Sequence, residues 1–213
     1  GIITSFSLPP YNIFILNFLT FSLFLIFLIE LKKQNQNSLK FFFYGWCFGF
    51  GYFLSSLYWI SISLTFDNNF KFLLPLSLIL IPAFLAIFYG LATFLLKFII
   101  NDKKIITSIL LFSLLLALVE FLRGNILSGF PWNLIGYSFS NQLEFIQINS
   151  VLGIYGFNLF SITIFAVPSI FILRNSKKEI FSLLFIIIVC IGILFYGFNS
   201  IDKFKAKEKI ISK

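Results

Sequence analysis

Residues 117–138 read ALVEFLRGNILSGFPWNLIGYS, and this stretch decides how the rest of the chain is interpreted. It carries two ionisable residues, Glu120 and Arg123, at the end of a long apolar run. The tetrapeptide Gly-Phe-Pro-Trp at 129–132 then interrupts any helix. Ionisable residues at membrane depth are costly, so they mark a candidate functional site.

The composition is that of an integral membrane protein. Of the 213 residues, 59% are hydrophobic and only 11% are charged, which is too few to keep such a surface polar in water. The net charge of +8 comes from short basic clusters between apolar runs, so no nucleic-acid partner is predicted. There is no histidine, and Cys47 and Cys190 lack a metal-binding spacing, so no metal or cofactor is predicted.

Uncharged runs long enough to cross a bilayer define the fold class. A hydrocarbon core of about 30 Å needs about 20 apolar residues in a helix, roughly twice the length of a transmembrane strand. We therefore predict an all-α membrane protein, a polytopic bundle of about six transmembrane helices with an interfacial aromatic segment. The predicted spans are 11–29, 41–65, 72–96, 105–125, 145–173 and 180–199. The membrane domain covers residues 1–201, and residues 202–213 begin a periplasmic segment.

Basic residues are distributed unevenly between the two sets of connections. The connections after the first, third and fifth spans carry nine lysines and arginines, whereas the opposite connections carry only Lys71 and Arg123. Because cytoplasmic loops are enriched in Lys and Arg, the first set is predicted to be cytoplasmic and both chain ends to face outward. The tail after Ile201 is also lysine-rich, but a tail leading into a long exported domain is translocated regardless of its charge.

The helix predicted at 105–125 must contain both Glu120 and Arg123. About 15 uncharged residues separate Lys104 from Glu120, roughly 22 Å of helix, which is shorter than the hydrocarbon core. A separation of three places the two side chains on one helix face, so each can partly neutralise the other. Two interpretations are open. One is an interfacial pair in which Arg123 reaches the head groups; the other is a cationic site that holds a lipid phosphate while Glu120 orients the guanidinium.

Residues 128–144 form a separate apolar and aromatic segment. The Phe130-Pro131 bond disfavours helix at Phe130, and the next charged residue is Glu144. We expect this segment to lie in the membrane interface on the outer side, with Trp132 and Tyr137 as anchors. It could also form the wall of a path by which a lipid leaves the bilayer sideways.

Several motifs resemble the membrane region of bacterial apolipoprotein N-acyltransferases. They are EFLRG at 120–124, SGFPWNLIGYS at 128–138, GIYGF at 153–157, LPPYN at 8–12 and GFGYFLSSLYWI at 49–60. The most specific is the combination of ExxRG with GFPW, and the resemblance covers nearly the whole chain. It implies a multi-pass enzyme of the bacterial inner membrane. Such an enzyme moves an acyl chain from a phospholipid donor to the N-terminal cysteine of a diacylglyceryl-apolipoprotein acceptor.

The same resemblance implies where the chemistry takes place. The family carries an exported nitrilase-like domain, whose Glu-Lys-Cys set takes the acyl group as a thioester and then passes it to the amine. No residue of that set can be placed in this chain, so no catalytic residue is predicted and the chain alone is expected to be inactive. The predicted substrate-binding or lipid-facing residues are Glu120, Arg123, Gly129, Phe130, Pro131, Trp132, Gly136 and Tyr137.

Two other classes of function stay open on the sequence. A truncated or degenerate copy would be a non-enzymatic membrane anchor or scaffold, and a stop codon downstream in place of a nitrilase-like region would reveal it. A small transporter would carry several ionisable residues near mid-membrane and often two related halves. Glu120 and Arg123 lie toward one end of their span, and no internal repeat is found.

Overall fold

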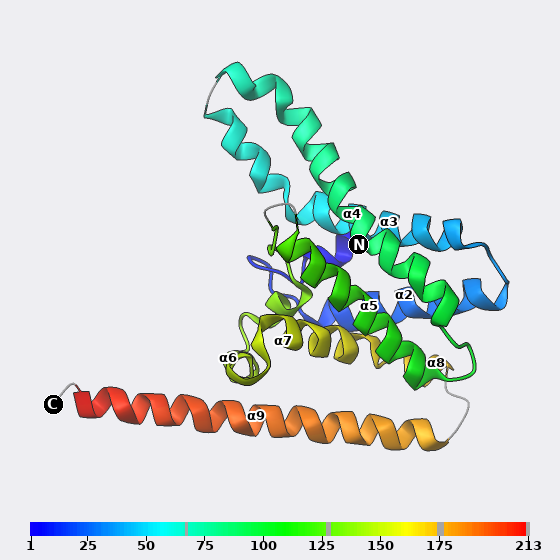
Figure 1. Ribbon diagram of the computed structural model, residues 1–213. Helices are drawn as coiled ribbons and strands as arrows, with labels where there is room; N and C mark the ends of the chain where they lie inside the picture. Colours follow the sequence, from blue (N-terminus) through cyan, green and yellow to red (C-terminus); the bar gives the residue numbers. More distant parts are fainter. Residues whose placement is uncertain (67, 127–128, 174–176, 212–213) are drawn as a thin grey trace.

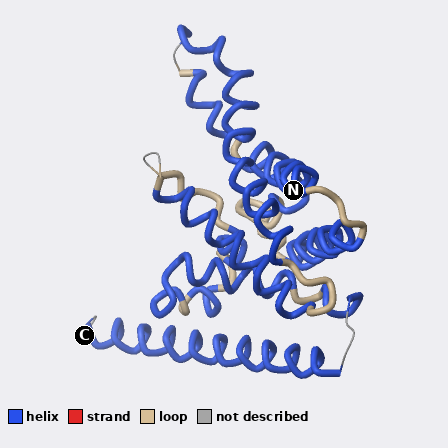
Figure 2. The backbone as a smooth tube through the Cα atoms, turned by 45° about the vertical axis from the view of Figure 1, so that its right-hand side comes forward, coloured by secondary structure: helices blue, strands red, loops and turns tan. Residues whose placement is uncertain are grey.

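The computed structural model describes residues 1–66, 68–126, 129–173 and 177–211, and in these ranges every regular element is a helix (Figures 1 and 2). The α-helices are α1 (Ile2–Ser5), α2 (Ile15–Lys33), α3 (Ser38–Ser56), α4 (Leu74–Ile99), α5 (Ile105–Asn125), α6 (Leu143–Ile146), α7 (Asn149–Ala166), α8 (Ser169–Leu173) and α9 (Lys177–Ile211). The 3-10 helices are η1 (Tyr58–Thr65), η2 (Asn68–Leu73) and η3 (Ile135–Phe139).

Five stretches of the described chain are long and apolar enough to cross a membrane, judged by length and composition. They are Ile15–Lys33, Lys71–Ile99, Ile105–Asn125, Asn149–Ala166 and Glu179–Lys205. This confirms an all-α polytopic membrane protein. α3 is a further long helix of 19 residues, but it is not among the five. Glycine, serine and tyrosine residues make its sequence less apolar.

The residues predicted as a span at 41–65 do not form one continuous α-helix. The α-helix ends at Ser56, and η1 continues the chain in a tighter turn. Within η1 the hydroxyls of Ser61 and Thr65 donate hydrogen bonds to carbonyl oxygens three residues earlier. Such local side-chain bonds compete with the regular α-helical pattern.

The predicted span at 145–173 is also interrupted, because the structure divides it among α6, α7 and α8. Inside α7, Gly153 has φ 68°, a left-handed conformation that breaks the helical path. Pro168 lies between α7 and α8, where its missing N–H ends the hydrogen-bond ladder. Only Asn149–Ala166 within this region qualifies as a span.

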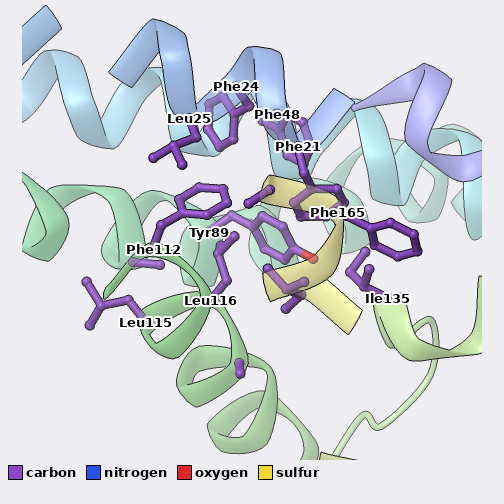
Figure 3. Close-up of a cluster of buried hydrophobic side chains, with 14 of the residues drawn as sticks. Phe21, Phe24, Leu25, Phe48, Tyr89, Phe112, Leu115, Leu116, Ile135 and Phe165 are labelled. Atoms are coloured by element: carbon purple, nitrogen blue, oxygen red, sulfur yellow. The ribbon is translucent and has the colours of Figure 1, made fainter. Parts of the chain in front are cut away.

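Interlocked aromatic rings form the core, with Tyr89 of α4 in the middle (Figure 3). Phe24 of α2 stacks on Phe48 of α3, with ring centroids 4.3 Å apart. Phe21 of α2 stacks on Phe165 of α7 at 6.1 Å. These pairs connect α2 with α3 and with α7 by specific ring geometries as well as by buried area.

Glycines allow α3 and α4 to approach closely. A Cβ added at Gly45 would lie 1.9 Å from Thr93 Oγ1, and one added at Gly49 would lie 2.9 Å from Tyr89 Cβ. The Thr93 hydroxyl donates a hydrogen bond of 2.7 Å to the carbonyl oxygen of Phe41, across the same contact. The small-residue spacing in α3 therefore brings two helices together as in other membrane helix pairs.

Lysines connect the helix ends at one end of the bundle. Lys32 Nζ, in the last turn of α2, donates to the carbonyl oxygen of Lys97 at 2.7 Å. Lys97 Nζ, in the last turn of α4, donates to the carbonyl oxygen of Gln36 just before α3. Cations stabilise the carbonyl-rich ends of helices. The carboxyl-terminal end of α3 therefore lies at the opposite, lysine-poor end of the bundle.

α9 runs along the outside of the bundle (Figures 1 and 2). It contacts the region of α6 and α7, where the hydroxyls of Tyr196 and Ser150 are 3.0 Å apart. Its 35 residues extend about 52 Å, which exceeds a hydrocarbon core of about 30 Å. The helix continues past residue 201, so no break in structure marks the predicted boundary of the membrane domain. The predicted last residues, 212–213, lie outside the described chain.

Candidate functional site

Glu120 of α5 is fully buried and receives hydrogen bonds from three directions. Tyr89 of α4 donates its hydroxyl to Glu120 Oε1 at 2.5 Å, and Asn158 of α7 donates Nδ2 to Oε2. The backbone N–H of Ile135 also bonds to the Glu120 carboxylate. Buried carboxylates require such partners, since desolvating an unpaired charge is expensive. Glu120 thus connects α4, α5, α7 and η3.

Arg123, one turn later on α5, is 2% exposed. Its Nη1 donates to the carbonyl oxygens of Phe130 and Trp132, both at 2.8 Å. The guanidinium carbon lies 5.1 Å from the centroid of the Phe53 ring, a cation–π geometry. Nε and Nη2 have no hydrogen-bond partner among the described residues.

Glu120 and Arg123 share a helix face, as their spacing predicts, but they bind different groups. No ion pair joins Glu120 to Arg123, both of which belong to the described part of the chain; Lys33 and Glu30 do form one, at 3.4 Å. Two carbonyl oxygens therefore orient the guanidinium, rather than the carboxylate. Both side chains are inside the protein, so the structure does not place them against lipid; a direct role in lipid binding stays a prediction.

The aromatic segment (residues 129–144) begins with a tight turn. Gly129 has φ 77°, and a Cβ there would lie 2.4 Å from the carbonyl oxygen of Gly124, so only glycine fits without strain. The backbone N–H of Phe130 donates to the Arg123 carbonyl at 2.9 Å. Residue 128, the predicted start of this segment, lies outside the described residues.

Buried polar groups from neighbouring helices bind the backbone of residues 133–136, which follow this turn. The Tyr52 hydroxyl donates to the carbonyl oxygen of Asn133 at 3.0 Å. The backbone N–H of Gly136 donates to Asn158 Oδ1 at 2.8 Å. Because Asn158 also donates to Glu120, the carboxylate supports this segment both directly and through Asn158.

Only part of the aromatic segment is exposed at the protein surface, and its position in the membrane interface stays a prediction. Leu134, Ile135 and Phe139 are buried in the core. Trp132 is 55% exposed, Tyr137 is 38% exposed and Leu143 is 60% exposed, so both predicted anchors are among the residues that face outward. The aromatic segment is therefore a half-buried wall of the protein rather than a segment lying entirely on its surface.

A pocket of about 590 Å³ lies against this wall. Three parts of the chain line it, and the lining residues are Ser5, Leu8, Pro9, Pro10, Tyr11, Ser55, Ser56, Tyr58, Trp59, Pro131, Trp132, Asn133, Tyr137 and Ser140. The rings of Trp59 and Trp132 meet edge to face, with centroids 5.8 Å apart. None of these residues is acidic or basic. Partial burial raises the pKa of the Tyr137 phenol, so it stays neutral at physiological pH.

The structure separates the predicted site residues into two groups. Pro131, Trp132 and Tyr137 line the pocket. The remaining five support the wall from behind or shape its backbone, and they are Glu120, Arg123, Gly129, Phe130 and Gly136. Among the described residues no cluster of His, Cys, Asp or Glu could hold a metal.

Sequence reasoning missed the residues that complete this site. Tyr52, Tyr89 and Asn158 bind the buried carboxylate or the segment it supports. Each is a polar residue inside an apolar run, which is the only sequence signal that sets it apart. Such residues in membrane helices usually face the protein interior.

Fold and site together define a class: a polytopic helical membrane protein with an uncharged aromatic pocket at one end, supported by a buried polar network. Comparison with known proteins gives the family. Residues 1–167 match the apolipoprotein N-acyltransferase N-terminal domain. The chain belongs to the apolipoprotein N-acyltransferase family.

Curated relatives carry the same name. The chain is 36% identical to the apolipoprotein N-acyltransferase of Brucella melitensis biotype 1 over 177 residues, covering 80% of this chain and 33% of that protein. It is 35% identical to the Rhodopseudomonas palustris protein, covering 81% of this chain and 32% of the relative. For the Rhizobium etli protein the identity is 35%, with 84% and 34% covered. The chain thus spans about a third of the length of the curated relatives it matches.

Proposed function

We propose that this chain is the membrane portion of an apolipoprotein N-acyltransferase of the bacterial inner membrane. The whole enzyme would transfer an acyl chain from a phospholipid to the N-terminal cysteine of a diacylglyceryl-apolipoprotein. The family match over residues 1–167 and the five apolar helices support this assignment. The observation that carries it is the uncharged aromatic pocket built by the same motifs that carry the family resemblance.

In this proposal the chain binds and positions lipid substrates, and the chemistry takes place elsewhere in the enzyme. Its two cysteines, Cys47 on α3 and Cys190 on α9, are not among the residues that line the pocket. The activated nucleophile that acyl transfer requires would come from a nitrilase-like domain. We therefore expect the 213 residues alone to transfer no acyl group.

The arrangement of the helices supports a periplasmic position for the pocket. The lysine contacts link α2, α3 and α4 at one end, whereas Ser55 and Ser56 at the far end of α3 line the pocket. The lysine-rich end is expected to be cytoplasmic. α9 leads from that end to the other and would carry the chain toward an exported domain.

The direct test is an acyl-transfer assay on the full-length gene product in proteoliposomes. The substrates are phosphatidylethanolamine and a diacylglyceryl-cysteine peptide, with the Brucella melitensis relative as the positive control. We expect transfer by the full-length product and none by residues 1–213. No transfer by a correctly inserted full-length product, beside an active control, would refute the proposed function. Transfer by residues 1–213 would refute the assignment of the chemistry to another domain.

A further inference from the structure

We propose that the pocket binds the uncharged diacylglyceryl group of the acceptor lipoprotein, and not the phosphate-bearing part of the phospholipid donor. This inference rests on the proposed function, because it assigns one of the two substrates to the site. The pocket has a volume of about 590 Å³, which is in the usual range for pockets that bind small ligands.

The pocket lacks the groups that bind phosphate. Phosphate sites in proteins use Arg, Lys or the amino-terminal end of a helix. No lining residue is basic, and the nearby Arg123 is buried and donates to the backbone of the pocket wall. Ser55 and Ser56 are instead the last residues of α3, where the helix dipole is negative. Tyr58 and Trp59, at the start of the 3-10 helix η1, also line the pocket, but no basic side chain is present there to neutralise a phosphodiester.

The lining does fit an uncharged glycerol diester. Ser56 and Asn133 line the pocket, and in the described part of the chain their buried Oγ and Nδ2 atoms have no hydrogen-bond partner; an ester carbonyl that reached either atom would gain a donor. The aromatic walls, including Trp59 and Trp132, suit the depth at which ester groups lie in a bilayer. In a diacylglyceryl-cysteine the glycerol carries a thioether in place of a phosphate, so the whole group that enters the pocket is neutral.

Two substitutions remove the donors with little change to the backbone. Ser56→Ala deletes the hydroxyl. Asn133→Gly deletes the amide, and glycine accepts the native φ of 56° at this position. The matched controls are Ser150→Ala, remote from the pocket lining, and Asn35→Gly, at φ 52° in the connection between α2 and α3.

The experiment is a fluorescence titration of residues 1–213 in nanodiscs, with Trp59 and Trp132 as reporters. The ligands are an S-(dihexanoylglyceryl)cysteine peptide, dihexanoylphosphatidylethanolamine and glycerophosphoethanolamine. We expect the S-(dihexanoylglyceryl)cysteine peptide to bind at least about tenfold tighter than dihexanoylphosphatidylethanolamine, and glycerophosphoethanolamine not to compete with it. Ser56→Ala and Asn133→Gly should each weaken binding of the peptide by about 3- to 10-fold, and both control variants should bind it with unchanged affinity.

Three outcomes would overturn the proposal: equal or tighter binding of dihexanoylphosphatidylethanolamine, competition by glycerophosphoethanolamine, or unchanged affinity in both pocket variants. Circular dichroism and the thermal transition of each variant confirm that it is folded. The titration needs no catalysis, so its failure and a failure of acyl transfer in the full-length product are separate results.

Discussion

Replacing Arg123 tests whether the buried polar network holds the wall of the pocket. Arg123→Ala removes two charge-assisted hydrogen bonds, to the carbonyl oxygens of Phe130 and Trp132. Bonds of this kind contribute about 1.5–3 kcal/mol each, so together they set an upper range of about 3–6 kcal/mol. The substitution also leaves the buried Glu120 without the nearby positive charge. Since the wall can relax partly toward solvent, we expect a loss of about 3–5 kcal/mol in the free energy of unfolding.

The conservative variant separates charge from geometry. Arg123→Lys keeps the positive charge near Glu120 but loses the planar fork that reaches two carbonyls, so we expect a smaller loss of about 1–3 kcal/mol. The measurement is SDS-induced unfolding in mixed micelles, followed by tryptophan fluorescence. Acrylamide quenching of Trp132 fluorescence in the folded state should also increase in Arg123→Ala, because the backbone carbonyl of Trp132 loses its hydrogen bond from Arg123.

Leu122→Ala is the matched control, since Leu122 is the neighbouring residue on α5 and is 40% exposed. An exposed substitution of this kind is expected to change stability by no more than about 0.5 kcal/mol. If Arg123→Ala behaved like Leu122→Ala in both unfolding and quenching, the assignment of Arg123 as a positioning residue would be wrong.

Three further predictions follow from other contacts. Asn158→Ala removes the link between Glu120 and Gly136, so it should lower the free energy of unfolding by about 2–4 kcal/mol in the same assay. The control Asn125→Ala, at an exposed helix end, should lower it by less than about 1 kcal/mol, and similar losses in the two variants would show that Asn158 is not part of the buried polar network. Gly45→Ala should abolish or severely weaken folding, because its Cβ would lie 1.9 Å from Thr93 Oγ1. The control Gly192→Ala should be tolerated, because a Cβ there has nothing within 4 Å, and a stable Gly45→Ala protein would contradict the α3–α4 packing. In a variant lacking Cys47 and Cys190, a cysteine at position 132 should react with an impermeant thiol reagent from the periplasmic side and one at position 35 only from the cytoplasmic side, and the reverse pattern would overturn the orientation.

Much of the architecture could be predicted without coordinates. The length of each uncharged run compared with the bilayer predicted an all-helical membrane protein, and lysines at alternate connections predicted which helix ends lie together. The Gly-Phe-Pro-Trp sequence predicted that α5 would be followed by a different kind of segment, and Gly129 at φ 77° shows why. These features depend on neighbouring residues only, so they can be recognised in a linear sequence.

The roles of Glu120 and Arg123 could be predicted only in part. Their cost inside a membrane marked them as important, but their partners come from remote positions: Tyr89 is 31 residues from Glu120, and Asn158 is 38 residues away. No local sequence pattern indicates that these residues contact Glu120 in the folded protein. The interruption of the span predicted at 41–65 was missed for a related reason, because η1 is as apolar as a membrane helix.

The sequence by itself therefore determined that this chain is helical, membrane-embedded and a member of its family, since hydropathy, charge and motif are local properties. Only the tertiary structure decided which side of each helix faces the protein, that Arg123 is buried and binds the backbone of the pocket wall, and that three separate segments enclose an uncharged pocket. The physical reason is the solvent. In a bilayer both the lipid-facing and the core-facing sides of a helix are apolar, so the polar-to-apolar contrast that identifies the buried side of a helix in water is absent.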